Sequence, residues 1–256
     1  MDTRGRVVVV TGGGGGIGGA LCRRFAADGA SSVVVSDINR QAAETVAAEI
    51  GGTAVAADVT VESDVQRLVS GTLAAHGRID IYCSNAGIAF GGGPEASDEA
   101  WRQSWDVHVM AHVYAARALL PRMLERRDGY IVGTISAAGL LNHVLAAPYG
   151  VTKAAGLSFF EWLAIAYHDQ GIRVSALCPL GVRTAMLAQA GERNFLAAGA
   201  LDPEQVAGAV VEAIRDERFL ILPHPEVGEF FLRKASDYDR WLRGMRRLRG
   251  RILEER

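Results

Sequence analysis

Seven short apolar runs recur along the 256-residue chain, and longer stretches with apolar positions at helical spacing separate them. The short runs consist mainly of Val, Ile, Leu and Ala, which is typical of strands covered on both faces. They are Arg6–Val10, Ser32–Ser36, Thr53–Ala57, Ile79–Ser84, Gly129–Ser136, Arg173–Cys178 and Phe219–Leu222. The helical stretches are Ile17–Asp28, Arg40–Ile50, Glu62–His76, Asp98–Arg126, Tyr149–Gln170 and Pro203–Asp216. This alternation predicts a doubly wound α/β sheet of seven mainly parallel strands with helices on both faces.

Residues 229–256 have a different pattern, and we expect them to form an extension of a single domain at residues 1–228. Apolar residues recur every seven positions, with two more between them, which predicts an amphipathic C-terminal helix. These residues are Phe231, Tyr238, Met245 and Ile252, with Trp241 and Leu248 between. The basic residues beside them are Arg233, Lys234, Arg240, Arg243, Arg246, Arg247, Arg249 and Arg251. The helix could pack on its own domain or a neighbouring subunit, cover a substrate pocket, or lie on anionic lipid.

Composition narrows the function classes. The formal net charge is −2, with 49% hydrophobic and 22% charged residues, which favours a globular protein with no nucleic-acid partner. Three widely spaced cysteines with no C-x-x-C pair predict free thiols in a reducing compartment. No apolar stretch is long enough to span a bilayer, and a strand begins about six residues from Met1. We therefore expect a cytoplasmic protein without an integral membrane span.

A glycine-rich turn follows the first predicted strand, in the sequence TGGGGGIGGALC from Thr11 to Cys22. Gly12, Gly16 and Gly18 have the spacing G-x-x-x-G-x-G and open the first helix. In such a fold this turn binds a dinucleotide, because glycines let the main chain approach the pyrophosphate at the helix N-terminus. The alternative is a surface loop. The position between a strand and a helix favours a Rossmann-type cofactor site.

Asp37 ends the second predicted strand, 19 residues after Gly18. This spacing suits an acid that binds the ribose hydroxyls of the adenosine. Its charge would repel a 2′-phosphate, so we expect NAD rather than NADP as cofactor. Arg40 could soften that preference, and Asp37 could instead cap the following helix.

A second group of residues carries candidate chemistry. Tyr149 and Lys153 are four residues apart, so a helix places both on one face. A nearby cation lowers the pKa of a phenol from its usual value near ~10, which suits proton transfer. Ser136 ends a predicted strand at the sheet edge where ligands bind.

Together these motifs resemble those of the short-chain dehydrogenase/reductase family. They are T-G-x-x-x-G-x-G at Thr11–Gly18, Asp58-Val59, Asn85-Ala86-Gly87, Ser136 and Tyr149-x-x-x-Lys153. They occur in the family's order and cover about residues 5–225. The resemblance implies an NAD-dependent oxidoreductase that interconverts a secondary alcohol and a ketone, with hydride transfer to or from the nicotinamide.

The resemblance also implies individual roles. Tyr149 would be the acid/base, Ser136 would hold the substrate oxygen, and Lys153 would bind the nicotinamide ribose and lower the tyrosine pKa. Asp58 and Val59 would contact the adenine. The other residues implied at the cofactor are Thr11, Gly12, Gly16, Ile17, Gly18, Asn85, Ala86, Gly87, Pro179, Val182 and Thr184.

Three positions depart from the family pattern. His108 replaces an asparagine that aids a proton relay, so it is either a relay group or a neutral core histidine. Pro179 is followed by Leu180, with glycine one place late, which changes the chain beside the nicotinamide. Ser84 replaces an asparagine, which we expect to matter little.

The predicted substrate pocket is mainly apolar and favours a hydrophobic small-molecule alcohol or ketone. Its expected lining is Ala138, Leu140, Asn142, His143, Met186 and Leu187. Arg183 or Arg193 could bind a carboxylate. The sequence predicts no metal site.

Assembly and reaction type leave alternatives. The predicted helices Asp98–Arg126 and Tyr149–Gln170 could pair two copies into a homodimer or homotetramer, as the family usually does. The chain could also be an NAD-binding sensor or scaffold with weak catalysis, or could catalyse imine reduction, epimerisation or dehydration on the same frame.

Overall fold

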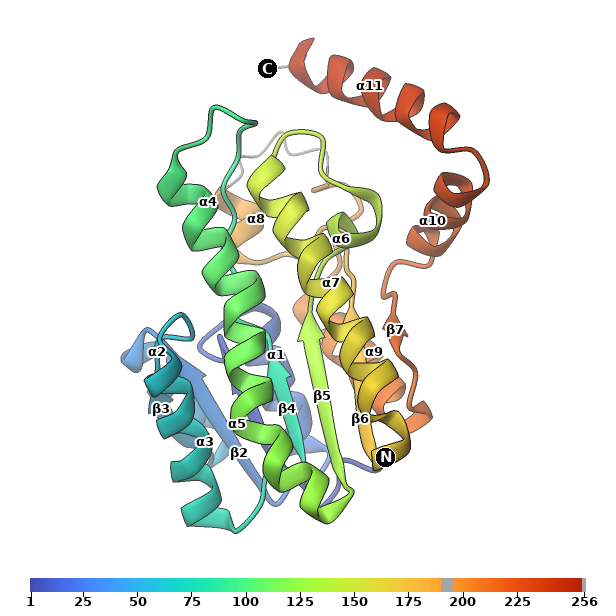
Figure 1. The fold of residues 1–256 in the computed structure, drawn as a ribbon. Coiled ribbons are helices and arrows are strands. Elements are labelled where there is room, and N and C mark those ends of the chain that lie inside the picture. Colours follow the sequence, from blue (N-terminus) through green and yellow to red (C-terminus); the bar gives the residue numbers. More distant parts are fainter. Residues whose placement is uncertain (190–195, 255–256) are drawn as a thin grey trace.

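A seven-stranded, wholly parallel sheet with the order β3-β2-β1-β4-β5-β6-β7 forms the centre of the computed structural model (Figure 1). The structure describes residues 1–189 and 196–254. The strands are β1 (Val7–Thr11), β2 (Ser32–Asp37), β3 (Thr53–Ala56), β4 (Ile81–Ser84), β5 (Gly129–Thr134), β6 (Ile172–Leu177) and β7 (Leu220–Ile221). Strands β2 and β3 lie on one side of β1, and β4 to β7 lie on the other. The strand order therefore reverses between β1 and β4, which is where such folds bind ligands.

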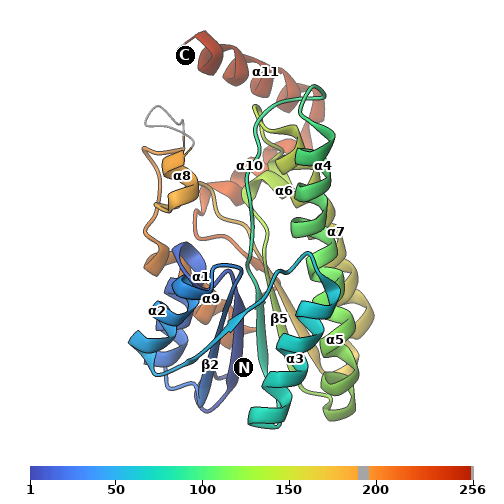
Figure 2. The same cartoon turned by 90° about the vertical axis from the view of Figure 1, so that its left-hand side faces the viewer.

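Helices cover both faces of the sheet, as predicted (Figure 2). The main ones are α1 (Gly16–Ala27), α2 (Arg40–Ile50), α3 (Glu62–His76), α5 (Ala111–Arg126), α7 (Ala147–Tyr167) and α9 (Pro203–Asp216). In β1, Val8 and Val10 pack with α1, α2 and α9, whereas Val9 packs with α3, α5 and α7. Successive side chains of a strand point to opposite faces, so one valine run supplies both cores.

The long helix predicted at Asp98–Arg126 is interrupted. It consists of α4 (Asp98–Trp105), a π-helical turn at Asp106–Met110 and α5. Ser97 caps α4, since its side chain accepts a hydrogen bond from the Ala100 N–H. The π-turn contains His108, and such turns often occur at functional sites.

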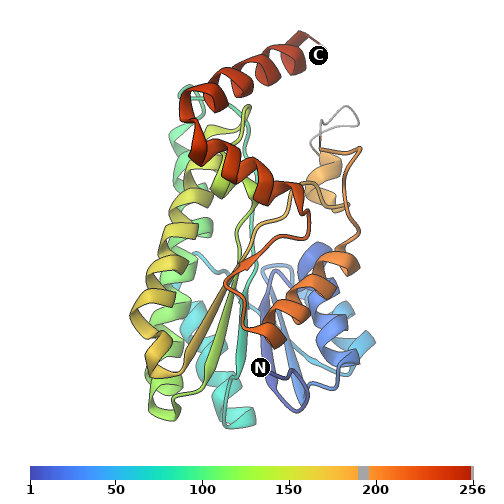
Figure 3. The same cartoon turned by 90° about the vertical axis from the view of Figure 1, so that its right-hand side faces the viewer.

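The C-terminal segment forms two helices instead of one, α10 (Glu226–Ser236) and α11 (Tyr238–Glu254). The chain is extended at Asp237, with φ −151°, and the Asp237 carboxylate accepts a hydrogen bond from the Arg240 N–H at 2.9 Å. This turn redirects the chain, so that α11 lies beyond the carboxyl ends of the strands (Figures 1 and 3).

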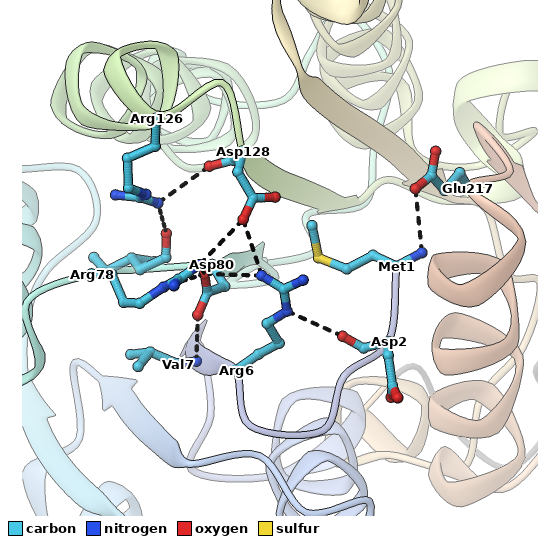
Figure 4. Close-up of polar contacts among 10 residues, drawn as sticks. Met1, Asp2, Arg6, Val7, Arg78, Asp80, Arg126, Asp128 and Glu217 are labelled. Atoms are coloured by element: carbon cyan, nitrogen blue, oxygen red, sulfur yellow. Dashed lines mark hydrogen bonds and ion pairs between the residues drawn. The ribbon is translucent and has the colours of Figure 1, made fainter.

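A charged network lies at the other end of the strands, at their amino termini (Figure 4). Asp80 is completely buried, and one of its oxygens accepts a hydrogen bond from the Val7 N–H at 2.8 Å. Arg6 and Arg78 form ion pairs with both Asp80 and Asp128. The network therefore connects the residues that precede β1, β4 and β5.

Candidate active site

A cavity of about 2460 Å³ opens along the carboxyl ends of the strands. At one end lie the β1–α1 turn and Asp37. At the other end lie residues of α10 and α11. Between them the cavity is lined by the segments that follow β4, β5 and β6. Most of the residues predicted from distant motifs therefore share one site.

The glycine-rich turn has the shape that a dinucleotide requires. Gly12 has φ +63°, and a Cβ on Gly18 would lie 2.0 Å from the Gly12 carbonyl oxygen, so the turn tolerates no side chain there. At Gly15, by contrast, a Cβ would meet nothing within 4 Å. Gly15 lines the cavity at the N-cap of α1, which has no side-chain cap. This open cradle at a helix N-terminus fits a pyrophosphate.

Asp37 lies at the end of β2 and lines the cavity. Its carboxylate accepts hydrogen bonds from the Gly14 N–H at 3.0 Å and from the Asn39 N–H at 2.9 Å. Asn39, rather than Asp37, caps α2 through the Ala42 N–H. Asp37 thus connects the glycine-rich turn to the second strand and keeps its charge at the cavity.

Asn85 holds the ends of three strands together beneath the site. Its side-chain nitrogen donates to the Thr11 carbonyl at 3.0 Å, and its side-chain oxygen accepts from the Thr134 hydroxyl at 2.9 Å. Thr11 is buried and accepts from the Asn85 N–H through its hydroxyl. Thr11 therefore supports the floor without lining the cavity, whereas Asn85, Ala86 and Gly87 do line it.

Ser136, Tyr149 and Lys153 converge on the cavity from the end of β5 and the first turns of α7. The Lys153 side chain is buried, and its Nζ donates to the Thr134 carbonyl at 2.9 Å. The same Nζ lies 5.7 Å from the centroid of the Tyr149 ring. Ser136 caps the short helix α6 (Ala137–Leu141), which fixes its position.

Burial sets the proton affinities of this group. It raises the pKa of the Tyr149 phenol above its usual value, and a side-chain hydrogen bond with Ser136 acts against that rise. It also lowers the pKa of the Lys153 ammonium to about 7. The predicted lowering of the Tyr149 pKa by Lys153 does not occur among these side chains: burial raises the pKa, and Ser136 is the group that acts against the rise.

His108 lies outside the cavity lining, in the π-turn. Its Nδ1 is 2.9 Å from the Thr152 hydroxyl, and its Nε2 accepts a hydrogen bond from the Ile88 N–H. Burial strongly lowers its pKa, so the ring is neutral. These contacts are those of a core histidine with both ring nitrogens hydrogen-bonded, which was one of the two predicted alternatives.

The chain after β6 is held by a residue that the sequence did not indicate. Buried His224 accepts a hydrogen bond from the Leu180 N–H through Nδ1, while its Nε2 is 3.2 Å from the Gly199 carbonyl. Pro179, Val182 and Thr184 line the cavity along this segment, and their predicted contacts with the cofactor stay predictions. Only the folded chain brings His224 to this loop, 44 positions downstream of Leu180.

Most of the residues predicted for the substrate end lie at the cavity. Ala138, Asn142, His143, Met186 and Leu187 line the cavity. Leu140 does not: it and the neighbouring Leu141 both pack in the core, and of the two only Leu141 also borders the cavity. Arg183 forms an ion pair with Asp202, and Arg193 lies outside the described residues.

The adenine pair also lies outside the cavity lining. The Asp58 carboxylate accepts hydrogen bonds from the N–H and hydroxyl of Thr60 at 2.9 and 2.7 Å. Asp58 and Val59 are half-buried just after β3. Their predicted contacts with the adenine stay predictions.

A parallel sheet with a glycine cradle, an acid at the second strand and a Ser-Tyr-Lys group defines a dinucleotide-dependent oxidoreductase. A family model described as short chain dehydrogenase matches residues 6–194. The chain belongs to this family.

Individual relatives agree with this assignment. The 1-deoxy-11-beta-hydroxypentalenate dehydrogenase of Streptomyces exfoliatus is 36% identical over 88% of this chain and 86% of its own. The 2,5-dichloro-2,5-cyclohexadiene-1,4-diol dehydrogenase of Sphingobium indicum is 41% identical over 75% of this chain and 79% of its own. A crystal structure of a short chain dehydrogenase/reductase from Burkholderia phymatum in complex with NAD has a TM-score of 0.85 and 28% identity, over 93% of this chain and 96% of that one.

Proposed function

We propose that this oxidoreductase uses NAD to interconvert a secondary alcohol and a ketone on a largely apolar substrate, with Tyr149 as acid/base. The observation that carries this proposal is the convergence of Ser136, Tyr149 and Lys153 on the cavity that also contains the glycine cradle. Two relatives are named as dehydrogenases of a hydroxypentalenate and of a cyclohexadiene diol, which supports an alcohol substrate.

The chain's own residues supply proton transfer and positioning. The Tyr149 oxygen takes the hydroxyl proton during oxidation and returns it during reduction. Ser136 hydrogen-bonds the phenol and the substrate oxygen, which holds that oxygen within reach of proton transfer. Bound nicotinamide would accept or donate the hydride at the carbon that bears this oxygen. Lys153 is positioned by the Thr134 carbonyl and faces the same space.

Asp37 carries the proposed preference for NAD. Its carboxylate faces the cavity beside the glycine cradle, and a 2′-phosphate there would meet a fixed negative charge. Arg40, three residues further on, lies 3.9 Å from the Glu44 carboxylate and is mainly exposed.

The direct test is to titrate NADH and NADPH separately and then to screen secondary alcohols and ketones by the absorbance of the reduced cofactor. We expect tighter binding of NADH and turnover of apolar substrates. Tighter binding of NADPH would contradict the role of Asp37. Cofactor binding without turnover of any alcohol or ketone would contradict the proposed reaction.

A further inference from the structure

Helix α11 forms the outer wall of the cavity that contains Tyr149. Trp241, Gly244, Met245 and Leu248 line this cavity from α11, at a helical spacing that places them on one side. Two contacts hold the C-terminal part of the helix there. The Arg249 side chain donates to the Val144 carbonyl at 3.2 Å, and buried Ile252 anchors its last turn.

The preceding helix fixes this position further. The Lys234 Nζ of α10 donates to the Leu140 carbonyl at 2.6 Å, and Val227 is fully buried. The Phe230 and Trp241 rings lie 6.4 Å apart, which joins α10 to α11. The wall is thus built from contacts with the segment 140–144, which follows Ser136.

A row of arginines borders this apolar wall. Arg240, Arg247 and Arg251 all line the cavity, and their spacings of seven and four place them along one side of α11. They are exposed, and none forms an ion pair within the part of the chain that the structure describes. Two carboxylates, Asp237 and Glu254, line the cavity without pairing with them.

Other basic residues of the tail have different surroundings. Arg233 pairs with Glu229 at 3.2 Å. Arg243 and Arg246 do not line the cavity. The unpaired arginines at the cavity are therefore a subset selected by position on the helix, and guanidinium groups bind oxyanions strongly and with defined geometry.

The volume of the cavity leaves room for a ligand that reaches this row. At about 2460 Å³, which includes the end assigned to the dinucleotide, it is well above the roughly 300–1,000 Å³ of a typical small-molecule site. Its middle is apolar, with Leu141, Val144 and Leu145 between Tyr149 and α11. A substrate that occupies the part of the cavity between Tyr149 and α11 would have its reactive carbon at Tyr149, an apolar body, and its far end at the arginines.

We propose that Arg240, Arg247 and Arg251 bind an oxyanion, a carboxylate or a phosphate ester, at the far end of the substrate. This inference rests on the proposed alcohol–ketone chemistry and names its substrate class: apolar alcohols or ketones with an anionic terminus. Attraction to the row makes the enzyme prefer such substrates over neutral ones of the same length.

The test uses three series of methyl carbinols of increasing chain length that end in a carboxylate, a phosphate ester or a neutral methyl ester. We expect kcat/KM of the wild-type enzyme to be about tenfold or more higher for one anionic series than for the esters, mainly through KM. Added salt should reduce this difference. The anionic series with the larger advantage identifies the group that is bound.

The variant Arg240→Gln/Arg247→Gln/Arg251→Gln should lose this advantage and keep the wild-type kcat/KM for the esters. The control Arg243→Gln/Arg246→Gln removes charge from the same helix outside the cavity and should retain the advantage. Equal use of anionic and neutral probes by the wild type overturns the inference. The inference is also overturned if the triple variant keeps the preference for anionic probes. It is overturned as well if the only effect of the triple substitution is a changed molar mass in solution, that is, a changed oligomeric state.

Binding without turnover separates this inference from the proposed reaction. In a Tyr149→Phe background, calorimetry should show binding of the anionic probe that the triple substitution abolishes. If no probe, esters included, is turned over by the wild type but this binding pattern holds, the reaction is wrong and the anion site stands. If esters are turned over and the anionic probe does not bind, the anion site is wrong.

Discussion

The Lys153 ammonium lies 5.7 Å from the centre of the Tyr149 ring and donates its hydrogen bond to the Thr134 carbonyl, at the end of β5. The two residues are one helical turn apart on α7, so the helix fixes their separation. Thr134 in turn donates to Asn85, which connects the pair to the ends of β1 and β4. The proposed acid/base group is therefore positioned by the sheet as well as by its own helix.

Replacing the phenol tests its assignment as acid/base. Tyr149→Phe removes only the hydroxyl, so we expect it to lower kcat by roughly 100- to 10,000-fold while NADH binding stays near the wild-type value. Steady-state rates and cofactor titration measure the two quantities. Tyr167→Phe, on the same helix outside the cavity, is the control. Wild-type turnover by the Tyr149 variant would exclude the role.

The pH dependence of oxidation tests the partner of the phenol. A base acts only when deprotonated, and burial raises the Tyr149 pKa, so oxidation rates should increase with pH into the alkaline range. Ser136 counteracts that rise in pKa. Ser136→Ala should therefore move the midpoint of the pH–rate profile to higher pH, and Ser136→Thr, which keeps a hydroxyl, should restore it. An unchanged midpoint in the alanine variant would show that Ser136 does not act on the phenol.

The charge of Asp37 is the expected source of cofactor choice. Asp37→Asn removes the charge and keeps an oxygen that can accept the Gly14 or Asn39 N–H. We expect the affinity for NADPH relative to NADH to rise by about tenfold or more, because the repulsion of the 2′-phosphate is lost. Parallel fluorescence titrations measure the ratio. Arg40→Gln tests the neighbouring cation; a larger change there than at Asp37 would reassign the preference.

The local sequence was sufficient to predict those parts of the site whose geometry is set within a single helix, strand or turn. The glycine-rich turn, the acid at the end of β2 and the four-residue spacing of Tyr149 and Lys153 all follow from single elements, and each reaches the cavity. Packing decided the rest. Leu140 and Leu141 are alike in sequence and are both buried in the core, but only Leu141 also borders the cavity.

The C-terminal segment, residues 229–256, was also predicted only in part from its local sequence. Its apolar period continues across Asp237, so the pattern indicated one helix, yet the chain turns there and α11 joins the cavity wall. The π-turn at His108 likewise has no local signal in the form of proline or glycine. The role of His108 as a relay group stays a prediction, and His108→Ala with an unchanged pH–rate profile would favour the core role.

His112 should make the protein sensitive to acid. It is buried, its Nδ1 is 2.7 Å from the Ser84 hydroxyl, and burial lowers its pKa from 6.5 to about 3. Between these values the unfolded state binds a proton that the native state does not. The free energy of unfolding therefore falls as pH decreases from about 6.5 to about 3, by about 1.4 kcal/mol per pH unit from this residue.

Denaturant titrations across this pH range measure the effect. His112→Gln keeps a polar group near Ser84 but takes up no proton, so its pH dependence should be shallower than that of the wild type by about one proton. His168→Gln, at an exposed histidine, is the control. Equal slopes for wild type and the His112 variant would mean that the histidine is protonated in the native state.

The network at the amino-terminal edge of the sheet should contribute to stability and not to catalysis. Asp80 is fully buried, and its carboxylate accepts the Val7 N–H and pairs with Arg6 and Arg78. Asp80→Asn removes the buried carboxylate charge that pairs with Arg6 and Arg78. We therefore expect the free energy of unfolding to fall by about 3 kcal/mol. Glu62→Gln, which breaks only the exposed pair with Arg117, should cost about 1 kcal/mol or less. The network lies at the amino-terminal ends of the strands, opposite the cavity, so kcat/KM of the folded Asp80 variant should equal that of the wild type. A small loss of stability together with a reduced kcat/KM would assign Asp80 to the active site instead.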